Sequence, residues 1–503
     1  MTPKEVLKSY FGYDSFRPMQ NEIIDTILQK KDTLAVMPTG GGKSLCYQVP
    51  AMIFTGLTLV ISPLIALMQD QASSLQQLGI PALFLNSSLD WDTYKANMFA
   101  VSQKKTKILF LAPESFTAER IINLLSKVSI DLIVIDEAHC ISEWGHDFRP
   151  EYRELSFLRH HFPKATILAL TATATHQVRR DIIENLGMQK GKVFVGSFNR
   201  PNIFLEVVPK KEPLMQLLAF LYAHKNESGI VYCFSRKQVD SVTSVLQRDG
   251  YNAQRYHAGL SDEERTKNLE NFLEDKTKII VATVAFGMGI DKGNVDFVVH
   301  FDLPKSLEQY YQEIGRAGRD GRKAHALLLY SGSDAHKIRY FFQDKTEHQR
   351  ILAENQLGNM VSFASNSLCR RKFLLSYFGE VENKKKSYCC DVCNGVQTKT
   401  SVDITGMAKI FLATVIQTGE KYGAGYLVQI LQGDFDERIR ENRHHKITAW
   451  GKGKNYEKTQ WYSLIEQLLD MGFIKKINKY GVLHITNEGK KALLSSEPIL
   501  VTV

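Results

Sequence analysis

The chain has 503 residues, more than a single hydrophobic core normally supports, so we expect three or four domains. Hydrophobic residues make up 44% and charged residues 23% of the chain, proportions typical of a globular protein. The formal net charge of +9 is compatible with binding to nucleic acid but does not establish it. Length and composition therefore exclude a single-core fold and leave the class of partner open.

A glycine-rich segment follows the first apolar run. Residues 33–36 predict a buried strand, and Met37–Ser44 continues it as Met-Pro-Thr-Gly-Gly-Gly-Lys-Ser. Consecutive glycines let backbone N–H groups approach a phosphate, Lys43 can neutralise the β/γ-phosphates, and Ser44 can hold Mg²⁺. The usual pattern begins with glycine where Met37 stands, so the assignment depends on the strand before it and the helix expected after it. The predicted nucleotide-binding residues here are Thr39, Gly40, Gly41, Gly42, Lys43 and Ser44.

The next 26 positions, residues 44–69, carry no formal charge. Pro50, Gly56 and Pro63 interrupt this stretch, so we expect a buried helix and strand in place of a membrane span. Further buried parallel strands are predicted at residues 57–61, 108–111, 132–135 and 167–170.

An acidic pair ends the third of these apolar runs. The strand predicted over Asp131–Ile135 is followed directly by Asp136-Glu137-Ala138-His139. Carboxylates at the C-terminal edge of a parallel sheet can act on a nucleotide bound there. We expect Asp136 to hold Mg²⁺ and Glu137 to polarise the attacking water, with His139 as a third catalytic residue. The alternative for either motif alone is a glycine-rich turn or an unrelated acidic strand end.

A polar junction, Asn199–Asn202, precedes a second α/β series that has no second phosphate loop. Its strands are predicted at residues 229–234, 278–282, 297–301 and 326–330. Two lobes with one phosphate loop suggest that the nucleotide lies between them. Late in this series, Arg316 and Arg319 are three residues apart, and they share one face if the segment is helical. An arginine delivered across a lobe interface can accelerate hydrolysis about 10³-fold or more, although a solvated basic helix is the alternative.

Four of the seven cysteines lie within residues 369–393. The N-terminus has no apolar signal core, so we expect a reducing compartment, where such clustering indicates a metal site in place of disulfides. Four thiolates suit a structural Zn²⁺ ion. The adjacent pair leaves open a three-cysteine site completed by another ligand, or buried thiols without metal. The predicted ligands are Cys369, Cys389, Cys390 and Cys393.

The last hundred residues predict a small helical domain that ends in a hairpin, with strands at residues 473–477 and 482–485. Helices followed by a two-stranded wing are typical of a winged helix. Tyr480 at the predicted wing tip is a candidate wedge against a terminal base pair, and an exposed tyrosine without a role is the alternative. The candidate phosphate contacts are Lys452, Lys454, Lys475, Lys476 and Lys479.

Together these motifs resemble the RecQ DNA helicases of helicase superfamily 2, over about residues 5–490. Residues 11–20 resemble motif 0 and residues 171–173 resemble motif III, which couples the lobes. Residues 230–236, 257–259 and 285–291 match the second-lobe motifs. The resemblance implies that Tyr13, Arg17 and Gln20 recognise adenine and that Asp291 also binds the nucleotide.

The segment Cys140–Tyr152 resembles the aromatic-rich loop of RecQ proteins. Trp144 and Phe148 can stack on unpaired bases, and Arg149 can pair with phosphate. We place His146 in the same DNA-binding set. Because the loop starts directly after the acidic pair, it could report DNA occupancy to the hydrolytic site. A core-packing aromatic cluster is the alternative.

The sequence thus predicts an α/β chain with two RecA-like parallel-sheet lobes, a helical zinc-binding domain and a winged-helix domain. The expected boundaries are 1–204, 205–338, 339–400 and 401–503. About a dozen residues follow the winged helix, so we expect a short form without the HRDC domain that many RecQ proteins append.

The resemblance implies an ATP-dependent DNA helicase that moves 3′ to 5′ in repair, recombination and replication, with ATP, Mg²⁺ and Zn²⁺ as cofactors. We expect single-stranded, tailed or forked DNA as partner, no membrane association, and a monomer. The expected location is the bacterial cytoplasm at the nucleoid, or the nucleus in a eukaryote. The alternatives are a superfamily 2 RNA helicase and a non-enzymatic DNA-binding or annealing protein with a vestigial motor.

Overall fold

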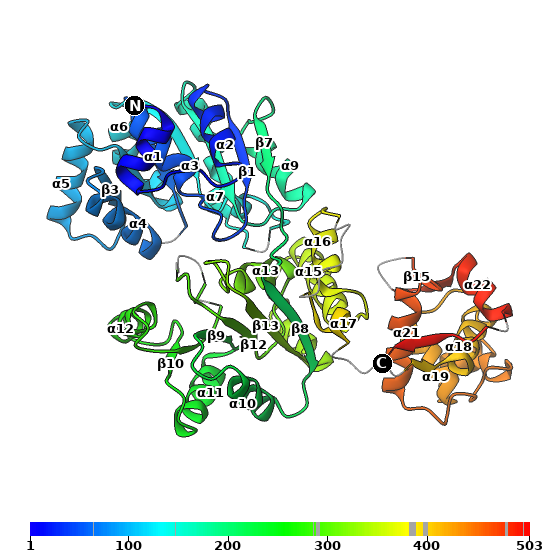
Figure 1. The fold of residues 1–503 in the computed structure, drawn as a ribbon. Helices are drawn as coiled ribbons and strands as arrows, with labels where there is room; N and C mark the ends of the chain where they lie inside the picture. The colour runs from blue at the N-terminus through cyan, green and yellow to red at the C-terminus, as the bar shows by residue number, and fades with distance from the viewer. Residues whose placement is uncertain are drawn as a thin grey trace. The chain divides into compact units, whose positions relative to one another are not determined.

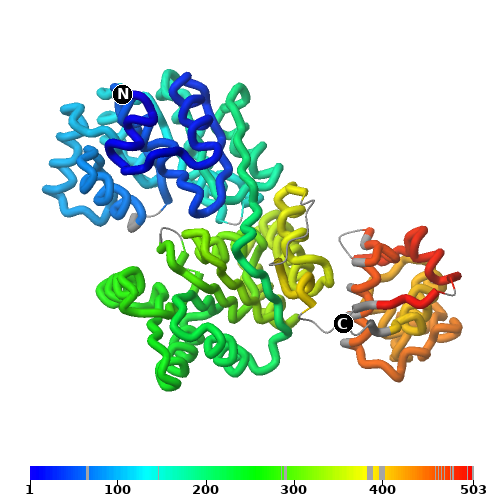
Figure 2. Tube along the Cα trace, viewed as in Figure 1, coloured from blue at the N-terminus to red at the C-terminus, as the bar shows by residue number. Residues whose placement is uncertain are grey.

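The computed structural model describes residues 1–63, 65–145, 147–284, 286–287, 292–381, 389–395, 401–477, 481–495 and 497–502 (Figure 2). The chain divides into two units, Met1–Asn394 and Gly395–Val503. Four of the predicted site residues lie outside the described residues: His146, Asp291, Lys479 and Tyr480.

Seven parallel strands form the sheet of the first lobe, in the order β3-β4-β2-β5-β6-β1-β7 (Figure 1). The strands are β1 (Thr33–Val36), β2 (Leu57–Ile61), β3 (Ala82–Leu85), β4 (Ile108–Leu111), β5 (Ile130–Ile135), β6 (Thr166–Thr171) and β7 (Lys192–Val195). The helices are α1 (Pro3–Phe11), α2 (Gln20–Leu28), α3 (Leu45–Ile53), α4 (Ile65–Gln77), α5 (Trp91–Ser102), α6 (Glu119–Leu125), α7 (Pro150–Arg153), α8 (Leu158–His161) and α9 (His176–Asn185). Short 3₁₀ turns are η1 (Pro113–Thr117), η2 (Ala138–Ile141) and η3 (Glu154–Phe157).

The central strands are apolar throughout because both faces of the sheet are covered. In β5, Ile133 and Ile135 pack into one hydrophobic cluster, whereas Leu132 and Val134 pack into another. Successive side chains of a strand point to opposite faces, so a continuous apolar run marks a strand buried on both sides. The uncharged stretch 44–69 contains α3 and β2, as expected for a buried helix and strand.

The second lobe has a six-stranded parallel sheet in the order β10-β11-β9-β12-β13-β8 (Figure 1). Its strands are β8 (Ile203–Pro209), β9 (Gly229–Tyr232), β10 (Ala253–Tyr256), β11 (Ile279–Ala282), β12 (Phe297–His300) and β13 (Ala324–Tyr330). Its helices are α10 (Pro213–Ala223), α11 (Arg236–Arg248), α12 (Asp262–Leu273), α13 (Leu307–Ile314) and α14 (Gly332–Tyr340). Because α13 ends at Ile314, Arg316 and Arg319 lie in the turn that follows it and do not share a helical face.

A helical segment carrying the cysteines packs beside the edge strand β8. It contains α15 (Glu347–Ser365), α16 (Arg370–Tyr377) and α17 (Asp391–Asn394). Leu205 of β8 forms an isolated bridge with Cys390, and the Leu205 N–H donates to the Cys389 carbonyl at 3.2 Å. The cysteine cluster is therefore fixed to the sheet of the second lobe.

The second unit is a winged helix, as the sequence predicted. Its helices are α18 (Thr405–Gln417), α19 (Ala424–Gln432), α20 (Glu437–Glu441), α21 (Lys458–Asp470) and α22 (Asn487–Leu494), with a 3₁₀ turn η4 (His444–Lys446). Its strand pairs are β14 (Ser401–Asp403) with β17 (Leu500–Thr502), and β15 (Ile474–Lys476) with β16 (Leu483–Ile485). Trp461 of α21 is fully buried, and its ring packs against Phe411 of α18.

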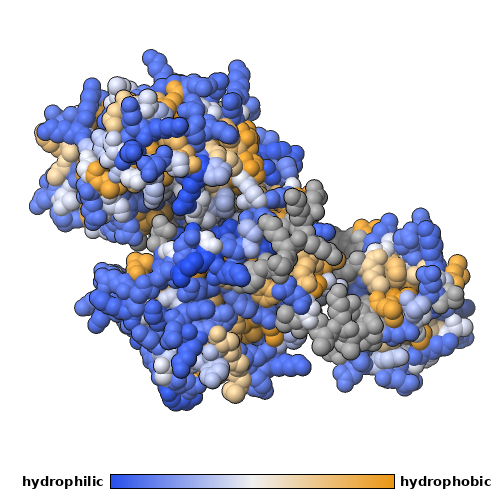
Figure 3. Space-filling model, in the orientation of Figure 1, coloured by the Kyte–Doolittle hydropathy of each residue, from blue (hydrophilic) through white to orange (hydrophobic). Residues whose placement is uncertain are grey.

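The fold class predicted from the sequence, two parallel-sheet lobes followed by a helical cysteine-bearing region and a winged helix, is confirmed. Among the described residues, no helix is both long enough and apolar enough to span a membrane. The face of the two lobes visible in Figure 3 carries mainly hydrophilic side chains with scattered apolar ones.

Candidate functional site

The phosphate loop joins β1 to α3 at the carboxyl edge of the first sheet. Gly40 and Gly42 both have φ of +76°, a region that disfavours other residues. A Cβ on Gly42 would lie 2.3 Å from the Gln20 amide nitrogen, which donates to the Gly42 carbonyl at 2.9 Å. Arg17 donates to the Gly40 carbonyl. Two of the residues predicted to bind adenine thus lie directly against the loop.

Two adjoining cavities open around this loop. The smaller, about 180 Å³, is lined from the first lobe by Lys43, Asp136 and Glu137 and from the second by Arg316 and Arg319. The larger, about 720 Å³, shares part of that lining and extends past the residues predicted to bind adenine. The residues common to both cavities are Gly40, Gly42, Ser44, Leu67, Gln71 and Arg319, and those of motif 0 in the larger one are Phe11, Tyr13, Ser15, Arg17 and Gln20.

The acidic pair lies at the carboxyl end of β5. Burial, together with the neighbouring Glu137 carboxylate, raises the pKa of Asp136 to about 6. Glu137 has a left-handed backbone, with φ of +48°, an uncommon conformation for a non-glycine residue that is often found at functional sites. A carboxylate buried in this way at a strand end is suited to receive a divalent cation.

His139 lies behind this pair and is only 1% exposed. Its Nδ1 is 3.2 Å from a Glu137 carboxylate oxygen and 3.0 Å from the Thr171 hydroxyl. Burial alone would lower the pKa of His139, but its contacts with Cys140 and Glu137 outweigh burial and raise it well above its usual range. The geometry therefore gives His139 the means to orient Glu137.

A buried chain of contacts runs from this histidine to the second lobe. The Thr171 hydroxyl donates to the Thr173 carbonyl at 3.1 Å. The Gln312 amide then donates across the lobe interface to the Thr173 hydroxyl at 3.2 Å. The sequence identified the segments but did not single out Gln312, whose partner lies 139 residues away.

The cationic side chains of this site are those that a nucleoside triphosphate requires. Arg316 is 6% exposed, and its Nε has no hydrogen-bond partner among the described residues. A buried donor without an acceptor is costly, so an anionic ligand in the smaller cavity would relieve it. Lys43, Arg319 and Asp136 line the same cavity. The donor set thus fits a magnesium-bound polyphosphate.

Arg200 is a second residue that the sequence did not single out as functional, although it lies in the polar junction between the lobes. It donates to the carbonyls of Gly315, Ala317 and Gly318, which flank Arg316. Its only sequence signal is the Asn-Arg-Pro-Asn run itself.

The predicted aromatic-rich loop is partly exposed. Trp144 is 43% exposed, and Phe148 is partly buried. Arg149 donates to the Asp147 carboxylate at 3.2 Å and to the Pro63 carbonyl at 3.2 Å. The guanidinium of Arg149 is thus already hydrogen-bonded within the protein. To contact a phosphate, it must share its hydrogens between the phosphate and these acceptors, or give up these hydrogen bonds.

The same loop is fastened to α15 of the cysteine-bearing segment. Gln356 donates to the carbonyls of Trp144, at 3.1 Å, and Gly145, at 3.3 Å. His348 packs edge-on against the Trp144 ring, with centroids 6.3 Å apart, and its Nδ1 is 3.3 Å from a Glu143 carboxylate oxygen. The loop therefore joins the acidic pair to a helix that follows the second lobe.

The four predicted zinc ligands converge. Cys369 Sγ lies 3.5 Å from Cys389 Sγ and 3.8 Å from Cys390 Sγ, and with Cys393 all four sulfurs lie within 4.8 Å of one another. Zinc–sulfur bonds of about 2.3 Å in a tetrahedron separate the sulfurs by about 3.8 Å. Although Cys389 and Cys390 are adjacent in sequence, both thiols therefore fit one four-cysteine zinc site.

In the winged helix, the candidate phosphate contacts that can be placed lie on the surface. Lys475 is exposed on β15, and Lys452 and Lys454 are exposed in the segment before α21. The predicted wedge, Tyr480, lies outside the described residues.

Four protein-family models match the chain in succession. They are described as DEAD/DEAH box helicase, residues 17–182; helicase conserved C-terminal domain, 209–321; RecQ zinc-binding, 332–394; and RQC domain, 398–503. Similarity to curated proteins extends along nearly the whole chain. The "ATP-dependent DNA helicase RecQ" of Pasteurella multocida is 43% identical over 99% of this chain and 79% of its own length. The protein of the same name from Bacillus subtilis is 37% identical over 97% of this chain and 83% of its own length.

Solved structures support the fold. The structure titled "S. cerevisiae Dbp5 bound to RNA and ADP BeF3" aligns with a TM-score of 0.54 at 18% identity, covering 70% of this chain and 97% of that one. The structure of Mycobacterium smegmatis helicase Lhr bound to ssDNA and AMP-PNP aligns with a TM-score of 0.54 at 17% identity, covering 97% of this chain and 61% of that one.

Two parallel-sheet lobes that both line one nucleotide-sized cavity define a two-lobed helicase motor. The chain belongs to the RecQ family of helicases, because it matches the RecQ zinc-binding and RQC models and is similar to curated RecQ helicases along nearly its whole length.

Proposed function

We propose that this RecQ-family helicase hydrolyses ATP to move 3′ to 5′ along one DNA strand, and so separates duplexes during repair, recombination and replication. The observation that carries the proposal is the cavity in which Lys43, Asp136 and Glu137 of one lobe meet Arg316 and Arg319 of the other. The relatives named as ATP-dependent DNA helicases support DNA as the substrate.

The proposed hydrolytic roles follow from what each side chain touches. Lys43 and Ser44 bind the phosphates and Mg²⁺, and Asp136 completes the cation site. Glu137, oriented by His139, holds the attacking water and takes its proton. When bound, MgATP supplies the phosphoanhydride that is cleaved and a divalent charge that offsets its anionic oxygens.

The adenine end of the nucleotide is assigned to the larger cavity. Tyr13, Arg17 and Gln20 provide a ring and hydrogen-bonding groups beside the phosphate loop, and Asp291 is proposed as a further contact. Because Gln20 and Arg17 also bond to the loop carbonyls, base recognition and loop conformation are coupled in this proposal.

Coupling between the lobes is assigned to the Thr173–Gln312 contact and to the two arginines. Arg316 and Arg319 neutralise charge that develops on the phosphates, and this interaction exists only while the lobes are closed. Its loss on hydrolysis lets the lobes separate, and each cycle shifts one lobe along the strand.

DNA contacts are assigned to the aromatic-rich loop and the winged helix. Trp144, His146, Phe148 and Arg149 would contact the single strand. Tyr480 would lie against the last base pair of the duplex. A Zn²⁺ ion held by the four clustered cysteines would have a structural role, because a closed four-thiolate shell leaves no open coordination position.

ATP turnover with and without polynucleotide tests the hydrolytic assignment. Turnover by the unsubstituted chain should rise with single-stranded DNA more than with RNA, and Lys43→Ala should abolish turnover while leaving much DNA binding intact. Hydrolysis that persists in Lys43→Ala would overturn the site, and stronger activation by RNA would favour an RNA helicase.

A further inference from the structure

The Arg200 guanidinium makes its shorter hydrogen bonds to one short stretch of backbone. Nη1 donates to the Gly315 carbonyl at 3.2 Å, and Nη2 donates to the carbonyls of Ala317, at 2.9 Å, and Gly318, at 3.0 Å. Nη1 also donates to the Thr39 carbonyl of the phosphate loop, at 3.5 Å. Arg200 is half-buried and is not among the described residues that line either cavity. Its side chain therefore contacts the backbone that carries Arg316 and, by one longer hydrogen bond, the backbone of the phosphate loop, and it does not line the cavities.

The planar fork of a guanidinium suits this task. Its donors are fixed relative to one another, so bonds to three carbonyls set both the position and the turn of the segment. A lysine at the same place would keep the charge but could not reproduce this set of donors. The segment so fixed carries Arg316, and Arg319 follows it directly.

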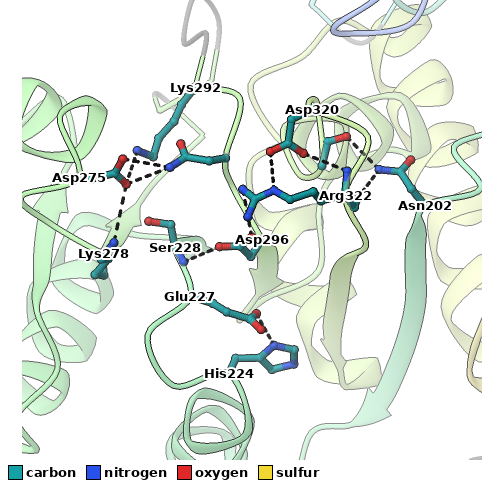
Figure 4. A network of polar contacts seen from close by, with 12 residues as sticks. Asn202, His224, Glu227, Ser228, Asp275, Lys278, Lys292, Asp296, Asp320 and Arg322 are labelled. Carbon is teal, nitrogen blue, oxygen red and sulfur yellow. Dashed lines mark hydrogen bonds and ion pairs between the residues drawn. The ribbon is translucent and has the colours of Figure 1, made fainter.

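Other contacts hold the same segment from both sides. The Thr39 hydroxyl of the phosphate loop donates to the Gly315 carbonyl at 3.0 Å. Asn202, two residues after Arg200, donates to the carbonyls of Gly318, at 2.9 Å, and Arg322, at 2.8 Å. Figure 4 shows Asn202 directed at the turn that carries Arg322. Within this turn, Arg322 forms an ion pair with Asp320.

A second arginine holds the backbone of Arg200 in place. Arg371 of α16 is 3% exposed, and it donates to the Arg200 carbonyl at 2.6 Å and to the Asn199 side-chain oxygen at 3.1 Å. Its other terminal nitrogen donates to the carbonyls of Ile203, at 2.6 Å, and Cys389, at 3.2 Å. The contacts thus form an unbroken series from the cysteine cluster, through the junction, to the arginines at the nucleotide site.

We infer that Arg200 is a positioning residue for Arg316 and Arg319, and that Arg371 connects the cysteine-bearing segment to ATP hydrolysis through it. This inference rests on the proposed function, because it requires those two arginines to act on the nucleotide. A shift of about 1 Å in such a group can lower a rate about 10²-fold without a direct contact being lost.

The test compares Arg200→Ala and Arg200→Lys with the unsubstituted full-length chain in DNA-stimulated ATP turnover. Both variants should lower kcat about 10²-fold while the KM for ATP changes less than about threefold, since an interaction made only in the transition state is lost. Arg200→Lys keeps the positive charge and removes the guanidinium, so its kcat tests the inference even if Arg200→Ala does not fold.

A matched control separates positioning from stability. Arg159 pairs with Asp32 at 2.6 Å and donates to the Ala165 carbonyl at 3.4 Å, at the edge of the first sheet opposite the phosphate loop. Arg159→Ala should lower the melting temperature and leave kcat unchanged. Equal kcat losses in Arg159→Ala and Arg200→Lys would show a stability effect only and overturn the inference.

Combined substitutions show the route of the effect. If Arg200 acts through the two arginines, Arg200→Lys should lower kcat much less in an Arg319→Ala background than it does alone. Arg371→Lys should lower kcat by less than Arg200→Lys does. The double variant should have nearly the same kcat as Arg200→Lys alone. Full additivity in either pair would contradict the inference. A lack of turnover in the unsubstituted chain would instead refute the proposed function, and the positioning role with it.

Discussion

Gly315 is the residue at which the phosphate loop, the inter-lobe junction and the arginine-bearing segment meet. Its carbonyl accepts hydrogen bonds from Thr39 and from Arg200. A Cβ at this position would lie 2.2 Å from the Thr39 hydroxyl, closer than real Cβ atoms approach. Glycine is therefore required here because the lobes are in contact. Backbone conformation does not require it, because the φ of Gly315 is an ordinary −62°.

Gly315→Ala should consequently separate the lobes at the nucleotide site. We expect kcat for DNA-stimulated ATP turnover to fall at least about 10-fold, because the two arginines move away from the phosphate loop. Forcing an extra methyl group into a packed site also costs about 1–3 kcal/mol of folding free energy. Steady-state kinetics and thermal melting measure the two effects.

Gly358→Ala is the matched control, since a Cβ on Gly358 within α15 meets no described atom within 4 Å apart from its chain neighbours and the adjacent backbone of its own helix. It should leave kcat unchanged and stabilise the helix by about 0.5–1 kcal/mol. Unaltered turnover in Gly315→Ala would mean that the lobes do not close through this contact.

At the scale of elements, the aromatic-rich loop depends on a helix from another part of the chain. Gln356→Ala removes the donors to the carbonyls of Trp144 and Gly145. Each hydrogen bond contributes about 0.5–1.5 kcal/mol, so amide exchange in the loop should accelerate about 2- to 10-fold or more. Hydrogen exchange followed by mass spectrometry measures the change at residues 142–149.

Glu354→Ala serves as the control for this experiment. Glu354 lies on the same helix but pairs with Arg339, at 3.0 Å, on the exposed surface. It should leave exchange in the loop unchanged. The same exchange rate in the unsubstituted chain and in Gln356→Ala would show that the helix does not restrain the loop.

The cysteine-bearing segment is the second element with a distinct prediction. The purified chain should contain about one zinc ion, and Cys390→Ser should lose it, because a four-thiolate site needs all its ligands for tight binding. Cys233→Ala, which changes a buried cysteine outside the cluster, should retain the metal. Elemental analysis distinguishes the two, and zinc retained in full by Cys390→Ser would remove that residue from the ligand set.

The sequence predicted the central strands better than the edge strands, for a physical reason. Central strands such as β5 are apolar on both faces, so their runs are continuous. The strands β7 and β10 were missed because they are partly or largely exposed and carry polar residues. The edge strands β3 and β8 were also missed, although both are largely apolar; β8 directly follows the polar junction at residues 199–202.

The candidate site was predictable where its residues are close in sequence. Lys43 with Ser44, and Asp136 with Glu137, form local motifs whose chemistry can be inferred from residue type. The Thr173–Gln312 contact and the role of Arg200 join residues more than a hundred positions apart. Such pairs depend on how the two sheets pack, which no local pattern specifies.

At the scale of the molecule, the parts of the first unit share a continuous apolar core. One hydrophobic cluster contains residues of both lobes and of the cysteine-bearing segment. Phe198, in the segment that joins the lobes, stacks on Phe378 of the cysteine-bearing segment with centroids 4.5 Å apart, and Tyr311 of the second lobe packs against both rings. Motion between the lobes must therefore be accommodated around this aromatic contact, next to the junction that contains Arg200.

Unwinding of one duplex that carries either a 3′ or a 5′ single-stranded tail tests the central claim most directly, with Lys43→Ala as the control. ATP-dependent separation from the 3′ tail alone, abolished in Lys43→Ala, is the predicted result. Separation from the 5′ tail would contradict the proposed polarity. DNA-stimulated ATP turnover without separation from either tail would contradict the helicase assignment and leave a motor that moves on DNA without opening it.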